Sequence, residues 1–470
     1  MLGTQLAVLC DGAPSGLTDA LDLVAGLDDA LVRGFARVGE DDAAALAALA
    51  GALAPTPLGD RVAEAVGKVT AGSVAEDHLV ALALAGARCA LLGAAHDALL
   101  GQLDAALGRA RAPWAPGTPE PPADAPPPLA GARAWLHELA VTGWGGVDHE
   151  LVATAAAPVE AALAEPGLRR LAVLLDGLAA ELRACAPVAT MAHPPVRRWA
   201  DLWARGLLLA QDAAAATAPP AVEEVSGRLL VLGVDVHEHD TAVQAQVHAI
   251  LEPADGAAPR LVRATVGAVK VETIVGPALW RLLDAHPVLL SALAERRSLA
   301  VTGMPLRGGD LLWRDDRARP GEAADPFATA RVLLSTAVAA ASAPLDRHPV
   351  GIAEPVLLEG YDVRDDDGAL AVELDGHRLA VAVDRLPSCG PLTAGLVAAS
   401  SACLGLLRWD DGRWLLQPLA VQATVKRKPV GAHTGDWACG VTDPKVAKAD
   451  AKAGDAVAVL RERAGRLLRR

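Results

Sequence analysis

The chain has few aromatic side chains and no asparagine at all. Only 3% of its 470 residues are aromatic, and it has seven lysines against 36 arginines. Amino acids with GC-rich codons, such as alanine, glycine, proline and arginine, take the place of the missing types. This bias indicates a GC-rich bacterial genome, so the excess of arginine over lysine is not by itself evidence of nucleic-acid recognition.

The sequence also lacks paired cysteines and a recognisable leader. A disulfide framework or a zinc finger needs clustered cysteines, and none of the six here forms a CxxC or CxC pair. The first residues have no basic region before a short apolar run, so we expect no secretory signal. These features predict a cytoplasmic protein with reduced thiols. The cysteines are Cys10, Cys89, Cys185, Cys389, Cys403 and Cys439.

Common catalytic signatures are missing as well. The chain contains no GxxxxGK[ST], no GxSxG, no HExxH and no GxGxxG between a strand and a helix. We therefore predict no catalytic residue and no cofactor. Two apolar stretches, 79–100 and 386–407, approach the length of a membrane span. Charged residues interrupt the first, and the second is rich in glycine, serine, alanine and proline, so we predict a buried helix in both and no membrane span.

Charge is distributed unevenly along the chain. The net charge of −14 disfavours binding to phosphate backbones. Residues 1–220 carry 14 basic and 25 acidic side chains, whereas residues 424–470 carry 11 basic and 5 acidic ones. This basic tail is a candidate anion-binding surface, although Trp437 is its only aromatic residue and single-strand binders use several stacking rings. The alternative is a solvated terminal helix.

Hydrophobic periodicity divides the chain into two halves. Leucine and alanine recur at helical spacing before Pro219, and partly alternating β-branched residues follow it. We predict an α+β fold, with an all-helical N-terminal half and a mixed, largely antiparallel β-rich C-terminal half with inserted helices. The predicted units are a helical domain at 1–111, a linker or loop with eight prolines at 112–130, a helical segment at 131–218, a β-rich α+β domain at 221–424 and a basic tail at 425–470.

Within the C-terminal half, turn residues separate the predicted strands. Segments 228–236, 242–251 and 260–273 read as antiparallel strands, and DDDG and DDG (410–412) are turn signals. Helices are predicted at 276–297 and 325–342. Further predicted strands lie at 299–303, 310–314, 355–363, 369–374, 378–384, 404–409 and 413–424.

Two groups of residues resemble catalytic or metal-binding sites. Asp235, His237 and His239 share one face of a strand, and two imidazoles with a carboxylate suit zinc or another divalent metal. The alternative is a polar hairpin tip. His433 lies near Asp436 and Cys439, as a nucleophilic thiol site requires. Here the alternative is a loop that packs Trp437.

The segment PPVRRWADLWARGLLLAQ is the most distinctive of the chain. Trp199 and Trp203 are four residues apart, so they share a helix face with Leu202 and Leu207. Tryptophan and arginine are enriched at interaction hot spots, which makes Trp199, Trp203 and Arg198 candidate partner-binding residues. The alternative, which we favour, is that both tryptophans pack inside the protein.

Several stretches of the C-terminal half resemble uncharacterised actinobacterial proteins that are encoded with MoxR-type AAA ATPases and von Willebrand factor A proteins. The closing strand pair is similar to SWIM zinc-finger proteins of those clusters, but the CxC and CxH of that finger are absent, so no zinc role carries over. The resemblance covers about half the chain and implies an accessory role beside a chaperone-like ATPase. The stretches are RLLVLGVDVHEHD (228–240), LAVTGMPL (299–306), PLDRHPV (344–350) and LRWDDGRWLLQPLAV (407–421).

The sequence therefore favours a non-enzymatic adaptor that binds another protein, such as a AAA ATPase or a von Willebrand factor A protein. One alternative is a metal-dependent hydrolase that uses Asp235, His237 and His239. The other is an anion or nucleic-acid binder that uses the basic tail.

Overall fold

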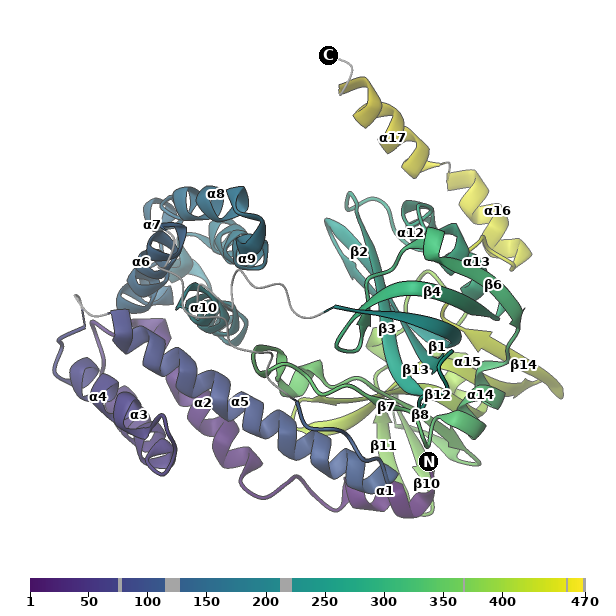
Figure 1. Ribbon diagram of the computed structural model, residues 1–470, viewed down its shortest axis with the longest axis horizontal. Coiled ribbons are helices and arrows are strands. Elements are labelled where there is room, and N and C mark those ends of the chain that lie inside the picture. The colour runs from purple at the N-terminus through teal and green to yellow at the C-terminus, as the bar shows by residue number, and fades with distance from the viewer. Residues whose placement is uncertain (75–77, 115–126, 212–221, 367, 454, 468–470) are drawn as a thin grey trace.

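The computed structural model describes residues 1–74, 78–114, 127–211, 222–366, 368–453 and 455–467. It contains two lobes, as Figure 1 shows. The helical lobe consists of helices α2 to α10, and the β lobe consists of α1 (Gly3–Cys10) together with everything from β1 onward. The predicted α+β fold with a helical N-terminal half is confirmed.

The helical lobe has one core. Leu49 and Leu84 precede the Pro-rich stretch and Leu136 and Leu175 follow it, yet all four belong to the same buried cluster. The two predicted helical segments are thus one packing unit. The helices are α2 (Leu17–Arg33), α3 (Glu40–Leu53), α4 (Gly59–Thr70), α5 (His78–Leu107), α6 (Pro127–Thr142), α7 (His149–Ala153), α8 (Ala156–Ala164), α9 (Arg169–Cys185) and α10 (Val196–Gln211).

Helix α5 joins the two lobes. Leu84, in its first half, lies in the core of the helical lobe, whereas Leu99 and Leu103 pack with the second sheet of the β lobe. Within the described residues, α5 is the one helix long and apolar enough to cross a membrane, with a mean hydropathy of 1.7 and half of that window buried. Because both cores use its apolar residues, the predicted buried helix at 79–100 is confirmed. Leu99 and Leu103 pack with the β lobe although they precede residue 111, where the first helical domain was predicted to end.

The first sheet closes on itself. Strand order runs β1-β2-β3-β5-β4, and β4 pairs back with β1. The predicted helix at 276–297 is two short helices, α12 (Ala278–Leu282) and α13 (Pro287–Glu295), whose apolar residues complete the core of this sheet. The strands are β1 (Glu223–His239), β2 (Ala242–Pro253), β3 (Arg260–Val269), β4 (Arg297–Arg307), β5 (Asp310–Leu311), β6 (Ala318–Ala323) and β7 (Val338–Ala339).

The second sheet packs against the first. Leu232 and Ile250 of the first sheet meet Leu404 of the second in a shared core, which α14 (Pro326–Leu333) also joins. Asp411 and Gly412 both have positive φ, so the predicted DDG signal is a tight hairpin turn. The strands are β8 (Glu354–Glu359), β9 (Asp362–Asp366), β10 (Ala369–Leu374), β11 (His377–Val381), β12 (Ser400–Asp410), β13 (Arg413–Val425) and β14 (Lys428–His433).

The helix predicted at 386–407 is wrong. This stretch contains only a short helix, α15 (Ala394–Ala398), followed by β12. Strand β12 pairs with β8 on one side and β13 on the other, so it is a central strand buried on both faces. Such a strand has a continuous apolar run that periodicity does not separate from a buried helix. The helix predicted at 325–342 also ends early, at Leu333.

Two predicted boundaries also shift. Strand β14 pairs with β13, so the β-rich unit continues to His433 rather than ending at 424. The remaining tail forms α16 (Pro444–Ala453), which lies against the β lobe, and α17 (Ala456–Leu467), which projects from it in Figure 1. Most of the Pro-rich stretch, residues 115–126, lies outside the described residues, but α6 begins inside the predicted stretch, at Pro127, as proline permits in a first helical turn.

Candidate functional site

Asp235 is the centre of a buried polar cluster between the two sheets. Its carboxylate accepts hydrogen bonds from Arg408 and from Gln417 Nε2, the latter at 2.7 Å, and His237 Nε2 lies 2.9 Å from its Oδ2. Burial alone would raise the pKa of Asp235, but the hydrogen bond from His237 and the charge of Arg408 outweigh burial and lower the pKa to about 2. Asp235 is therefore an anion that joins β1 to β12 and β13.

His248 of β2 completes this cluster. It is 1% exposed, its Nε2 has no hydrogen-bond partner among the described residues, and burial lowers its pKa to about 3. A neutral imidazole and an anchored carboxylate resemble a general acid–base pair. However, Arg408 and Gln417 already occupy the Asp235 oxygens, so the arrangement connects the two sheets.

The structure does not support the predicted metal site. His239 lies beyond the cluster, where its exposed ring contacts Thr241 Oγ1 at 3.2 Å. Asp235 and His237 are brought together, but no group of three or more histidine, cysteine, aspartate or glutamate side chains in the described part of the chain could hold a metal ion. Alternate residues do share a strand face, yet an extended strand advances about 3.3 Å per residue, so His239 at the end of β1 lies about 13 Å along the strand from Asp235.

His433, Asp436 and Cys439 do not form a nucleophilic site either. Asp436 accepts two hydrogen bonds from Arg296 Nη2, at 2.9 and 3.0 Å, and one from the backbone N–H of His433. Burial raises the pKa of the Cys439 thiol, which is the opposite of activation. The side chains order a loop that packs the buried Trp437, as the alternative interpretation proposed.

Trp199 and Trp203 are fully buried, so in this structure they are not available to a partner. The ring of Trp199 meets that of Trp144 edge to face at 5.8 Å, and Trp203 meets Phe35 at 6.4 Å. The favoured interpretation, packing within the chain, matches this burial. Arg198 differs, since it is exposed and its guanidinium holds Glu181 of α9 with Nε at 2.8 Å from Oε1.

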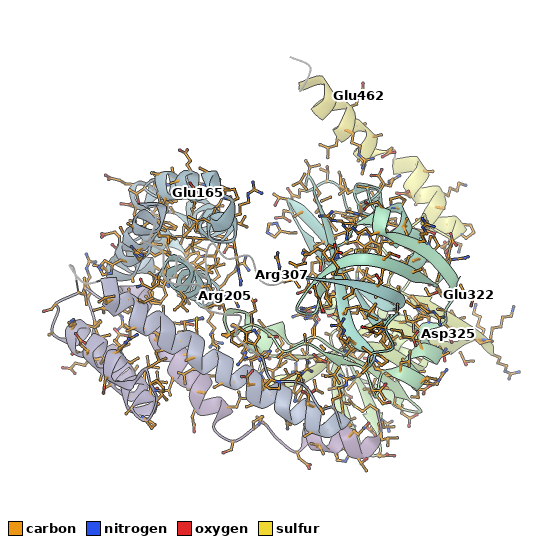
Figure 2. The ribbon with its side chains drawn as sticks, in the orientation of Figure 1. Glu165, Arg205, Arg307, Glu322, Asp325 and Glu462 are labelled. Atoms are coloured by element: carbon orange, nitrogen blue, oxygen red, sulfur yellow. The ribbon has the colours of Figure 1, made fainter. Side chains whose placement is uncertain are left out.

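The exposed side of the same two helices contains a groove. It lies between α9 and α10 and has a volume of about 340 Å³, within the usual range for binding pockets of ~300–1,000 Å³. Figure 2 shows Arg205 on α10, on the side of the helical lobe that is turned toward the β lobe. The groove is lined by Arg170, Val173, Leu174, Gly177 and Glu181 of α9, Arg198, Leu202, Arg205 and Leu209 of α10, and Leu345.

Leu345 reaches the groove from the β lobe, on the loop between β7 and β8, residues 340–353, which we call the crossing loop. Asp346 of this loop pairs with Arg170 at 2.5 Å, and Arg347 pairs with Asp97 of α5 at 2.7 Å. The β lobe thus contributes an apolar side chain to the lining of the groove and a carboxylate to one of its arginines.

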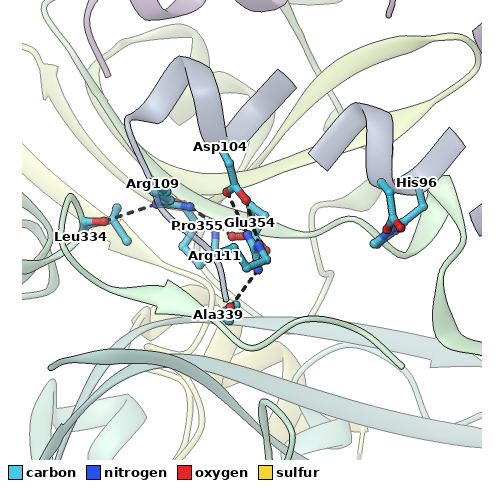
Figure 3. Close-up of polar contacts among 9 residues, drawn as sticks. His96, Asp104, Arg109, Arg111, Leu334, Ala339, Glu354 and Pro355 are labelled. Carbon is cyan, nitrogen blue, oxygen red and sulfur yellow. Dashed lines mark hydrogen bonds and ion pairs between the residues drawn. The ribbon is translucent and has the colours of Figure 1, made fainter. Parts of the chain in front are cut away.

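A buried ionic junction fixes α5 to the β lobe, as Figure 3 shows. Arg109 contacts Glu354 of β8 at 3.1 Å and donates to the carbonyl oxygens of Pro355 and Leu334. Arg111 holds Asp104 and Glu354. Burial lowers the pKa of Arg109, and the charge of Glu354 opposes that effect. The junction therefore links the chain at the end of α5 to β8 through buried ion pairs.

Part of the predicted basic tail serves the fold. Arg461 of α17 pairs with Asp284 at 2.6 Å and donates to the carbonyl oxygen of Arg281, and Val457 is buried against the first sheet. These contacts hold the start of α17 on the β lobe.

Sequence reasoning missed Arg408, Gln417 and His248, although a signal was present. All three interrupt apolar strand segments, where a polar residue needs a buried partner. The groove had no comparable signal, because it depends on how α9, α10 and the crossing loop meet.

Comparisons with known proteins found no matching family model, no significantly similar curated protein and no significantly similar solved structure.

Proposed function

We propose that this protein is a non-enzymatic, cytoplasmic adaptor that binds another protein through the α9–α10 groove. The groove itself carries the proposal. Val173 on its wall is 69% exposed, and apolar side chains of both helices line it beside three guanidinium groups. Exposed apolar surface with a charged rim is typical of protein-binding sites.

The resemblance of the C-terminal half supports the choice of partner. The proteins that it resembles are encoded with MoxR-type AAA ATPases and von Willebrand factor A proteins, and this association favours one of these components as the partner. We propose that the β lobe contacts one of these components while the helical lobe holds a second protein. The junction at Arg109 suits this role, because it links the β lobe to the helix that continues into the helical lobe.

Site-specific photo-cross-linking in a native host tests the proposal. A photo-reactive residue replaces Val173, and in a control chain it replaces Val332, which is 70% exposed on α14. We expect one dominant adduct from position 173, identified by mass spectrometry, and none of that identity from position 332. Equal or absent adducts at the two positions would contradict the proposal.

A further inference from the structure

The charge of the groove differs from that of its surroundings. Helices α9 and α10 contain six arginines against three acidic residues, whereas residues 1–220 as a whole have 14 basic and 25 acidic side chains. Six of the 14 basic residues are therefore on the two groove helices. Among the side chains that line the groove, three are arginines and one is a glutamate. Each of these arginines already pairs with a carboxylate, from Glu181, Asp201 or Asp346, so an acidic ligand is complementary to this surface where it replaces or joins these partners.

The exposed pairs of these arginines are exchangeable. Arg198 with Glu181 and Arg170 with Asp346 are at least partly exposed to solvent, whereas Asp201, which pairs with Arg205, is mostly buried and also holds the buried Arg88. Exposed ion pairs contribute little to stability, so a carboxylate of a ligand replaces or joins them at low cost. Arginine also favours two-point contacts with carboxylates, as the Arg198–Glu181 pair shows.

The crossing loop indicates the chemistry of the ligand. Leu345 packs into the groove and the next residue, Asp346, pairs with Arg170 at its rim. Within the chain itself, this surface therefore already binds an apolar side chain that is followed by a carboxylate.

The rest of the groove has room for the same pattern. A Cβ atom at Gly177 would meet nothing within 4 Å, whereas one at Gly206 of α10 would lie 3.0 Å from Leu136. Gly206 thus serves the packing of α10 on α6, while Gly177 leaves the groove wall open. Two adjacent helices with an open seam present the geometry that accepts a third amphipathic helix.

We infer that the α9–α10 groove binds an acidic amphipathic helix of a partner protein, with apolar side chains in the seam and carboxylates on Arg198 and Arg205. This inference rests on the proposed function and specifies the partner class.

Fluorescence anisotropy with the full chain tests the inference. The probe is a labelled amphipathic peptide with leucines at i and i+4 and glutamates beside them, compared with versions in which every glutamate is glutamine or lysine. We expect the glutamate peptide to bind best, and its affinity to fall as NaCl rises from about 0.05 M to about 0.5 M, because salt screens exposed charges. Equal binding of the glutamine peptide, or tighter binding of the lysine peptide, overturns the inference.

Matched variants locate the site. Arg198→Gln should weaken binding about tenfold, as expected for a lost charge-assisted contact. Arg331→Gln should not, although Arg331 also holds an exposed glutamate, Glu359 of β8. Gly177→Trp should abolish binding by filling the groove. Gly67→Trp on α4, where a Cβ also meets nothing within 4 Å, should leave it unchanged.

Two outcomes separate this inference from the proposed function. If the cross-link at position 173 captures a protein that the glutamate peptide does not displace, the inference fails and the adaptor function stands. If position 173 captures no protein, the adaptor function fails. A second copy of the chain is the other candidate occupant of the groove, and light scattering measures whether the protein forms a dimer. A dimer that Gly177→Trp dissociates would show that a second copy fills the groove and would overturn the inference.

Discussion

The indole Nε1 of Trp203 donates a hydrogen bond to the backbone carbonyl oxygen of Leu136 at 2.8 Å, which ties α10 to α6 inside the helical core. Trp199, one turn earlier, is equally buried, but its Nε1 has no partner in the described part of the chain. The two tryptophans therefore have the same burial and different hydrogen bonding, so equivalent substitutions should have unequal effects.

Trp203→Phe should destabilise the protein more than Trp199→Phe. The first loses a buried hydrogen bond, worth about 1 kcal/mol, and the second removes an N–H group that has no partner. Alanine at either position should cost ~3–5 kcal/mol. Urea unfolding measures these differences. Equal free energies of unfolding for the two phenylalanine variants would contradict the role assigned to the Trp203 hydrogen bond.

The junction at the end of α5 makes a second prediction. Arg109→Ala should cost about 3 kcal/mol, because it removes a buried ion pair and the donor for two carbonyl oxygens. Arg378→Ala, at an exposed pair with Glu373, should cost less than about 1 kcal/mol. Hydrogen exchange should also rise in residues 95–107 of the Arg109 variant. Unchanged protection there would show that the apolar contacts of α5 hold the lobes together without the ionic junction.

The lowered pKa of Asp235 predicts how the stability of the protein depends on pH. Its pKa is about 2 in the folded protein and near 3.8 in the unfolded chain, so its contribution is fully present above pH ~4 and is lost as pH falls toward 2. That contribution is about 2 kcal/mol. The difference in unfolding free energy between the native chain and Asp235→Asn should therefore be large at neutral pH and shrink toward pH ~2–3. A constant difference across that range would show that the charge of Asp235 is unimportant.

Sequence patterns predicted those structural elements that are determined by residues close together in the chain. The four-residue spacing of Trp199 and Trp203 specified one buried helix face, and the DDG turn specified the hairpin of β12 and β13. The prediction for 386–407 failed because a strand that is paired on both sides need not alternate apolar and polar residues. Its apolar run is therefore compatible with either a buried helix or a buried strand.

The candidate site was only partly predictable. Asp235 and His237 are two residues apart on one strand, so their proximity follows from local geometry. Their partner Arg408 is 173 residues away from Asp235, and the packing of two sheets brings it there. The groove was harder to predict from the sequence, because Leu345 comes from the other lobe and no periodicity links it to α9 or α10.

The crossing loop provides the last prediction. If Asp346 occupies one guanidinium of the groove, removing its charge should free Arg170 for a carboxylate of the ligand. Asp346→Asn should therefore strengthen binding of the glutamate peptide several-fold. It should change the free energy of unfolding by less than about 1 kcal/mol, since both members of the pair are about half exposed.

Asp97→Asn is the matched control for this prediction, because it breaks a different ion pair of the loop, that of Arg347 with Asp97, in which neither side chain lines the groove. It should leave peptide affinity unchanged. If both variants strengthen binding equally, release of the crossing loop explains the effect, and Arg170 is not a carboxylate contact. If Asp346→Asn weakens binding, the loop is part of the binding surface and does not compete with the ligand.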